Sequence, residues 1–258
     1  MPSSTLVKDF LFRTSTQLLD LAPQFERWGE IELVDAVNDG QRVIAKLLPH
    51  TCSRVDTVRL VPGTRQGIAL IRAADILPGD GSAAVDAYGQ MLLGVHRNMG
   101  GDGRTPGSTL RIVDRDVLDS TQPDWHTKAG TPREYTYDPR TPKVFYVSPG
   151  VPATGNTWVE ISFVADPTPV PNTGGLFAKS GNSTIKLSID DRNVDDLFYY
   201  VMARANLKEA EYGGNANLAA SYTQLFVNSM NGQVAAVTGV NPNLKNLPMN
   251  PGAPASAS

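Results

Sequence analysis

The residues best suited to metal chemistry are a histidine and the only cysteine, which stand two positions apart as His50 and Cys52. A zinc ion bound to a protein takes three or four ligands from histidine, cysteine and carboxylate side chains. The other two histidines, His96 and His126, lie far along the chain. We therefore interpret His50 as part of a helix end and Cys52 as a buried side chain, and we predict no metal site and no cofactor.

A second candidate is the glycine-rich stretch GGDGRTPG at residues 100–107. A phosphate-binding loop of the P-loop type ends in Gly-Lys-Ser/Thr and opens a helix. Here the stretch continues as Ser-Thr-Leu into a segment with strand character. The pattern therefore predicts a long connection between strands and no nucleotide site.

Carboxylates occur in pairs at Asp190-Asp191 and Asp195-Asp196, with Asp80 further upstream. Glycosidases place two carboxylates across a cleft, but nothing in the spacing puts these residues opposite one another. Capping of a helix N-terminus explains the four clustered aspartates more simply. No Gly-x-Ser-x-Gly nucleophile elbow is present, and we predict no catalytic residue.

Aromatic side chains recur in the segments with strand character. If these side chains face outward, they form a platform for a carbohydrate. If they face inward, they fill the core of a sheet, and this is the interpretation that we favour. These residues are Tyr135, Tyr137, Phe145, Tyr146, Trp158 and Phe163.

The charge balance argues against adhesive contact with nucleic acid. The net charge is −3, 19% of residues are charged, and lysines and arginines are dispersed, whereas proteins that grip phosphates carry a basic patch. One cysteine excludes an internal disulfide. No signal peptide and no apolar run near the roughly 20 residues of a membrane span is evident, so we expect synthesis in the cytoplasm and no membrane partner.

Two helices are expected at the N-terminus. Apolar residues cluster between residues 6 and 21, and they repeat at helical spacing between 30 and 48. In the second segment Glu30 and Glu32 lie near the start and Lys46 near the end, as the helix dipole favours, and Pro49 terminates the helix.

The middle of the chain predicts β-structure. Residues 55–71 contain Pro62-Gly63 between two apolar runs and are interpreted as a β-hairpin. About seven short strands in succession imply an antiparallel sheet, a sandwich or a barrel. The stretch 167–175, rich in proline, is interpreted as a linker.

Helix returns after residue 188. Ser188 is the expected N-cap, and apolar side chains surround the following helix on nearly all sides, which indicates burial or an interface. Gly213-Gly214 is expected to end this helix and Asn215 to cap the next, making a helical hairpin. The residues assigned to packing between subunits are Phe198, Tyr199, Tyr200 and Met202.

From residue 232 the chain is expected to be an extended arm, because it has few apolar residues and one charge, Lys245. Its regularly spaced apolar residues are predicted to anchor it on another chain. These interface residues are Val234, Val237, Val240, Leu244, Leu247 and Met249.

The fold expected from these elements is of the α+β class. Residues 1–52 and 188–231 would form one helical domain, a bundle of the N-terminal and C-terminal helices. Residues 53–187 would form an inserted antiparallel β-rich domain, and 232–258 the extended C-terminal arm.

Five stretches together resemble a known family. They are WGEIELVDAVNDGQRVIAKLLP, VRLVPGTRQ, VDRDVLDSTQPDW, YDPRTPKVFYVSPG and LFYYVMARANLKEAEYGGNANLAASYTQLF. In type and order they are similar to the adaptor, or head-completion, proteins of short-tailed bacteriophages. The resemblance covers most of residues 28–232, with residues 73–89 as an insertion and the end of the chain outside the shared pattern.

The resemblance implies a structural virion protein without enzymatic activity, located at the portal vertex in the tail or neck. It implies a homo-oligomeric ring of about twelve subunits, bound to the portal and to tail nozzle or tail fibre proteins. Genomic DNA would pass through the ring during ejection without sequence-specific binding. The alternative is a carbohydrate- or cell-wall-binding β-module of a phage tail, which would be a monomer with exposed paired aromatics.

Overall fold

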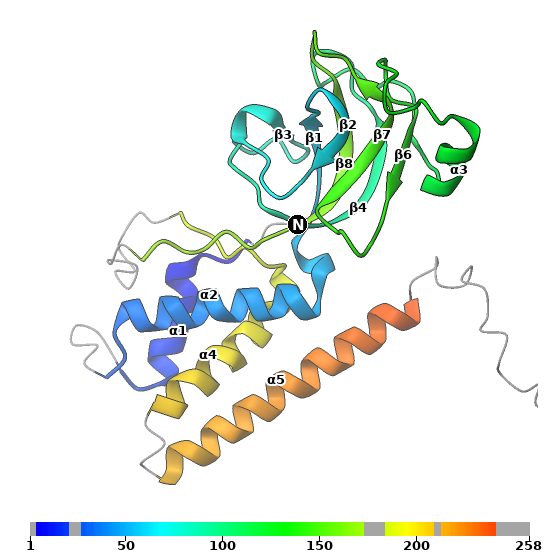
Figure 1. Ribbon diagram of the computed structural model, residues 1–258. Coiled ribbons are helices and arrows are strands. Elements are labelled where there is room, and N and C mark those ends of the chain that lie inside the picture. Colours follow the sequence, from blue (N-terminus) through cyan, green and yellow to red (C-terminus); the bar gives the residue numbers. More distant parts are fainter. Residues whose placement is uncertain (1–3, 21–26, 173–183, 209–212, 241–258) are drawn as a thin grey trace, which may run out of the picture.

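The four longer helices gather on one side of the molecule, and the strands lie on the other side together with one short helix (Figure 1). The computed structural model describes residues 4–20, 27–172, 184–208 and 213–240, without the side chains of 213–215 and 237–240. Along the chain, two helices precede the strands and two follow them. The protein is therefore of the mixed α+β class.

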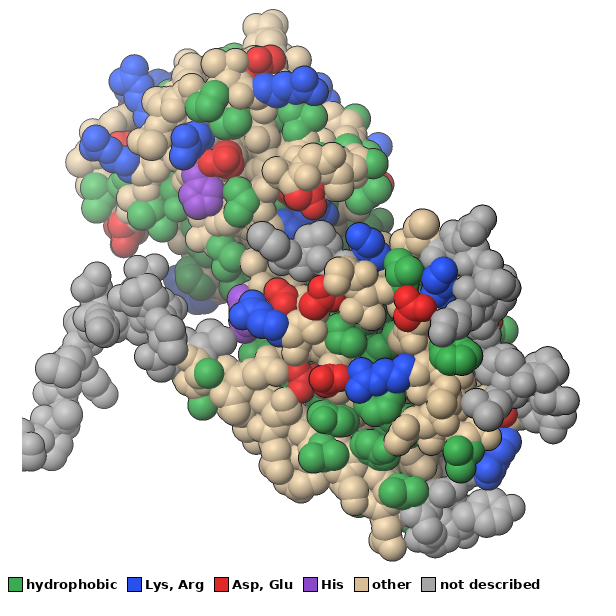
Figure 2. Space-filling view, turned by 180° about the vertical axis from the view of Figure 1, so that it is seen from behind, with side chains coloured by type: hydrophobic (Ala, Val, Ile, Leu, Met, Phe, Trp, Pro, Cys, Tyr) green, Lys and Arg blue, Asp and Glu red, His purple; other side chains and the backbone are tan. Residues whose placement is uncertain are grey.

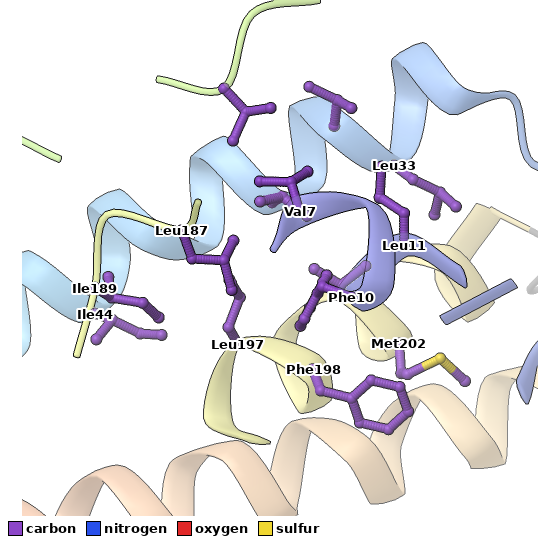
Figure 3. Close-up of a cluster of buried hydrophobic side chains, with 14 of the residues drawn as sticks. Val7, Phe10, Leu11, Leu33, Ile44, Leu187, Ile189, Leu197, Phe198 and Met202 are labelled. Carbon is purple, nitrogen blue, oxygen red and sulfur yellow. The ribbon is translucent and has the colours of Figure 1, made fainter. Parts of the chain in front are cut away.

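The helical region combines segments from both ends of the described chain. Its helices are α1 (Val7–Gln17), α2 (Glu30–Leu47), α4 (Val194–Lys208) and α5 (Gly213–Val240). α4 lies among the other three, and α5 runs along α4 and extends past it (Figure 1). The buried side chains that these helices share form one hydrophobic cluster, drawn in Figure 3, with Phe10, Leu11, Leu33, Leu197 and Phe198 among its members.

Helix α2 follows its sequence pattern closely. Glu30 and Glu32 occupy the first turn and Lys46 the last, as the helix dipole favours. Gly40 lies where α2 meets α4: a β-carbon at this position would stand 2.5 Å from Leu197 Cδ1 and 2.8 Å from Tyr200 Cδ1. The absence of a side chain therefore sets how closely these two helices approach.

The strands form two four-stranded sheets with a second hydrophobic cluster between them. The pairs are antiparallel except β5 with β6. The first sheet has the order β3 (Ile76–Pro78), β1 (Ser53–Arg59), β8 (Trp158–Ala165), β4 (Gly89–Asn98). The second has the order β2 (Gly63–Gly67), β7 (Val144–Val151), β6 (Glu134–Tyr137), β5 (Arg111–Ile112), with helix α3 (Arg115–Thr121) following β5.

The prediction of a β-hairpin at residues 55–71 is wrong. β1 pairs with β3 and β8, whereas β2 pairs with β7 in the other sheet. The corner between them is held by a side chain: Gln66 accepts from the Val61 N–H at 2.9 Å and donates to the Val61 and Gly63 carbonyls at 2.8 and 3.1 Å. Pro62-Gly63 makes the turn, but the pairing partners come from distant parts of the chain.

The stretch expected to be a linker is packed against α2 over the residues that the structure describes. Asn38 in α2 donates to the Val170 carbonyl at 3.0 Å and accepts from the Val170 N–H at 2.7 Å. Val170 is 3% exposed and belongs to the helical cluster. Val164 of β8 is a member of the same cluster and Met91 of β4 packs against it, so the first sheet rests directly on the helices.

Three expectations about the C-terminal helices need correction. Asp190, not Ser188, caps the short 3-10 helix η3 (Asp191–Asn193) before α4, by accepting from the Arg192 N–H at 3.0 Å. Gly213 and Asn215 lie inside α5, which begins at Gly213. The expected extended arm is also helical at its start, because α5 continues through residues 232–240.

Candidate functional site

The histidine and cysteine of the segment 50–52 lie in a short 3-10 turn (Pro49–Cys52) between α2 and β1. The Cys52 thiol is buried, which raises its pKa, and it lies 3.8 Å from the Ser188 carbonyl oxygen. Desolvation lowers the pKa of His50. Within the described ranges no three histidine, cysteine or carboxylate side chains are grouped in a way that could hold a metal ion.

The glycine-rich loop is a connection between strands, as predicted. The Asp102 carboxylate accepts from the Arg104 and Thr105 N–H groups at 3.0 and 3.1 Å and from the Thr105 hydroxyl at 2.9 Å. These hydrogen bonds lower the pKa of Asp102 to about 2. Two backbone donors of this loop, the Arg104 and Thr105 N–H groups, are therefore used by the loop itself, and the chain continues toward β5.

The four clustered aspartates hold the start of α4 in place. Asp190 caps the turn, Asp191 accepts from the Ser4 N–H and hydroxyl at 2.9 and 2.7 Å, and Asp195 pairs with Arg13 at 2.8 Å. Asp191 and Asp195 therefore tie the start of α4 to the N-terminal segment and to α1. The fourth, Asp196, is 3% exposed and reaches α5.

The aromatic residues of the strands do not form an outward platform. Tyr135, Phe145, Trp158 and Phe163 are buried, and Tyr137 and Tyr146 are half-buried. Tyr146 meets the buried Trp125 edge to face, with ring centroids 6.3 Å apart. The structure therefore favours the interpretation that these aromatic side chains fill the core of the sheets.

The apolar side chains of α4 are covered within the chain. Phe198 is 6% exposed and Met202 is 2% exposed, and both belong to the helical cluster (Figure 3). Tyr199 and Tyr200 are half-buried. Tyr199 stacks on Tyr222 of α5 at 6.4 Å, and Tyr200 meets Phe226 at 5.5 Å. α5 therefore takes up the faces of α4 that the sequence assigned to a neighbouring subunit.

Helix α5 differs from the rest of the chain in the charge of its surface. Its 28 residues include no charged side chain, although 19% of the whole sequence is charged. The stripe that faces α4 is buried or half-buried and comprises Ala219, Tyr222, Phe226, Met230 and Gln233. In the space-filling view, the lower left edge of the helical region, where α5 runs, shows hydrophobic and neutral side chains (Figure 2).

At 100° per residue, the exposed residues of α5 fall into three further stripes. One side carries Leu218 and Leu225, which are 49% and 47% exposed, and is here called the Leu flank. The other side, the Val flank, carries Val227 and Val234, which are 42% and 39% exposed. Opposite the buried stripe lies a row of exposed amides, the amide stripe, formed by Asn217, Gln224, Asn228 and Asn231.

The C-terminal part of α5 is fastened to the start of α4 by a polar contact. The Gln233 amide donates to the buried Asp196 carboxylate at 2.7 Å, and Asn193 donates to the same carboxylate at 3.0 Å. Asn193 also donates to Gln233 Oε1 at 2.6 Å. A buried carboxylate is costly without donors, so these three side chains set the position of α5.

Of the predicted interface anchors, Val234 lies in α5 and is part of the Val flank. Val237 and Val240 are in the same helix, but their side chains are outside the described ones. Leu244, Leu247 and Met249 lie outside the described residues. The assignment of these residues to an interface stays a prediction. The sequence analysis did not single out Leu218, Leu225 and Val227, whose exposure belongs to a helix of 28 residues without a charged side chain.

Surface hollows lie between α2 and α4, at the boundary between helices and sheets, and in the β-region. One of about 380 Å³ lies between α2 and β4, beside Arg42, Lys46 and Met91. Another of about 620 Å³ lies between α3 and the β6–β7 turn, where Asp138 is paired with Arg140. Of the helices that the structure describes, none is long and apolar enough to cross a bilayer.

Residues 5–244, nearly the whole chain, match the model of one protein family, described as SU10 adaptor protein. Among curated protein sequences, none matches this chain.

Proposed function

Because the chain belongs to the SU10 adaptor protein family, a family of structural adaptor proteins of bacteriophages, we propose that it forms a ring that joins the portal to the tail. The ring would contain about twelve copies around one rotation axis. It would lie in the neck of the virion, bind the portal on one side and a tail nozzle or fibre protein on the other, and leave a passage for the genome during ejection.

The observation that carries this proposal is the family match over residues 5–244. Two features of the molecule support it. Exposed apolar side chains line α5, a helix without charge, as expected of a surface that another protein covers. The candidate catalytic residues described above are occupied in capping, core packing or loop hydrogen bonds, so the geometry supports assembly better than turnover of a substrate.

We further propose that the helical region, 1–52 with 188–231, and the β-region, 53–187, are two domains with different contacts in the virion. The two hydrophobic clusters support this division, because one lies among the helices and the other between the sheets. The residues beyond α5, including Leu244, Leu247 and Met249, would reach onto the portal or a neighbouring subunit.

The test is binding of the purified full chain to the portal protein of the phage that encodes it. Sedimentation velocity and native mass spectrometry would measure the mass of the complex as the adaptor is added. We expect saturation at about twelve copies per portal ring. A chain that sediments separately from the portal at all concentrations would overturn the proposal.

The carbohydrate-binding alternative lacks its supporting observation, because four of the six aromatic side chains that it requires are buried.

A further inference from the structure

The arrangement of stripes on α5 indicates more than a single covered face. The Leu flank and the Val flank lie on opposite sides of the helix, each about a quarter turn from the stripe that packs on α4. One partner on one side could cover only one flank. The stripe that packs on α4 lies between the two flanks, so covering both flanks requires two neighbours.

We propose that α5 packs side by side with the α5 helices of two neighbouring copies, Leu flank against Val flank, with the amide stripe facing the DNA passage. This inference rests on the proposed ring and names the surface that closes it. Contact between two different flanks is heterologous, and a heterologous contact repeated about a rotation axis closes into a ring in which all α5 helices run in the same direction.

Charge is the first argument for a second copy as the occupant. A partner surface that carried lysine or glutamate side chains would bury them against Leu225 or Val227 without an opposite charge, which is unfavourable. α5 is itself uncharged over its whole length. The Val flank of one copy is therefore a suitable cover for the Leu flank of the next.

Size is the second argument. A helix of 28 residues is roughly 42 Å long and about 10 Å wide, so that each flank offers on the order of 400 Å². A stable two-chain interface needs about 800 Å² per partner. One flank is too small to hold a dimer, whereas a copy in a closed ring buries both flanks, about 800 Å² in total over its two contacts.

The amide stripe then points away from the body of each copy and into the opening that the helices surround. Gln224 donates to Asn228 at 2.9 Å along this stripe, so that the amides hydrogen-bond to one another. DNA-binding surfaces gain their affinity from lysine and arginine contacts with phosphates. A wall of neutral amides lets DNA pass without holding it.

Cysteine trapping tests the contact directly, because the chain has one cysteine and that residue is buried. In a Cys52→Ala background, Leu225→Cys and Val227→Cys are made singly and together. Residues two positions apart point to different sides of a helix, so the pair in one chain cannot bond internally. Oxidation of the double variant at high protein concentration should give a ladder of covalent oligomers, and the single variants should not.

Three results would overturn the inference. Equal trapping of Leu225→Cys alone, stopping at a dimer, would show that two Leu flanks meet face to face. A double variant that gives no ladder, either free or bound to the portal, would show that α5 helices do not meet. If the full chain gives no ladder and a chain lacking residues 241–258 does, that segment is the occupant of the flanks.

Opposite charges give a second readout. Leu225→Glu and Val227→Lys alone should each abolish ring formation, whereas the chain with both substitutions should form rings that weaken as salt is raised. Loss of portal binding by the unmodified chain refutes the proposed function. Normal rings from the Leu225→Glu chain refute only the role of α5.

The amide stripe is tested with Gln224→Lys/Asn228→Lys, compared with Gln224→Ser/Asn228→Ser. Both chains should form rings of unchanged mass. The lysine ring should retain linear double-stranded DNA in a filter assay at low salt, at least tenfold more than the serine ring. Equal retention by the two rings would show that the stripe does not face the passage.

Discussion

Helices α4 and α5 follow one another in the chain and are both rich in apolar residues, yet they have different surroundings. α4 is apolar on nearly all sides, and α1, α2 and α5 cover it within one chain. α5 is buried along one stripe and exposes leucine and valine on either side of it. The comparison teaches that apolar content alone does not decide whether a helix is covered within its own chain, because the elements packed around it decide this.

The two helices also differ in how charge is used. α4 begins with Asp195 and Asp196, which bind Arg13 and the amides of Asn193 and Gln233. These contacts fix α4 to α1 and to α5. α5 has only neutral side chains, so its position depends on packing and on the hydrogen bonds of Gln233. The following predictions test this difference, beginning with the largest expected effect.

Replacing Phe198 by alanine should lower the free energy of unfolding by about 3–5 kcal/mol, because it opens a cavity in the helical core. The Phe198 ring meets those of Phe10 and Tyr222 at 6.5 and 6.4 Å. Leu225→Ala on the exposed flank of α5 is the matched control and should stay within about 0.5 kcal/mol. Chemical denaturation measures both, and equal losses would show that the two helices are not distinguished by burial.

Replacing Gln233 by leucine should destabilise the chain by about 1–3 kcal/mol, because the buried Asp196 carboxylate loses a donor. Gln224→Leu, which breaks the exposed hydrogen bond to Asn228, should have an effect below about 0.5 kcal/mol. Urea denaturation followed by circular dichroism compares the two. A Gln233→Leu chain as stable as the unmodified one would mean that α5 does not need this contact.

Replacing either of two glycines by alanine should change the stability of the chain in opposite directions. Gly40→Ala should destabilise by about 1–2 kcal/mol, because the added β-carbon meets Leu197, which has no room to move in the core. Gly232→Ala in α5 meets nothing within 4 Å and should stabilise by about 0.5–1 kcal/mol through helix propensity. Thermal unfolding of the two chains gives the signs, and the same sign for both would contradict the description of α5 as exposed.

Two truncations should separate stability from attachment. Removal of residues 241–258 leaves the Gln233 contact intact and should change the free energy of unfolding by less than about 0.5 kcal/mol, while weakening portal binding. Removal of residues 232–258 also removes Gln233 and should cost about 1–3 kcal/mol. Calorimetry and co-sedimentation with the portal provide the two readouts. A 241–258 truncation that binds the portal with unchanged affinity would contradict the role of the end of the chain in attachment.

Much of the fold could be predicted where the determinants are local. The spacing of Leu33, Val37 and Ile44, with acidic residues before and Lys46 after, defines α2 correctly. The prediction of a loop around Asp102 was also correct, because this loop is held by hydrogen bonds between residues close in the sequence. The strands β4, β6, β7 and β8 lie in the middle of the chain, where β-structure was predicted.

The errors concern partners that are distant in the sequence. The apolar runs on either side of Pro62-Gly63 are strands, but they do not pair with each other. β1 pairs with β8, which lies about a hundred residues later in the chain. The composition of 232–240 indicated an extended segment, whereas the helix persists with Gln233 bound to Asp196, 37 residues earlier. The assignment of Phe198 and Met202 to packing between subunits stays a prediction, and the structure adds that both side chains are buried among helices whose positions the sequence does not show.

The amino-acid sequence alone determined the helices, most strands, the turn chemistry and the resemblance to phage adaptors, because these depend on residue type and on spacing within one element. Only the tertiary structure decided which apolar side chains are buried inside the chain and which stay exposed on its surface. The physical reason is that burial is a property of the neighbours a side chain has. Leu197 and Leu225 are the same residue in consecutive helices, yet one is 0% and the other 47% exposed.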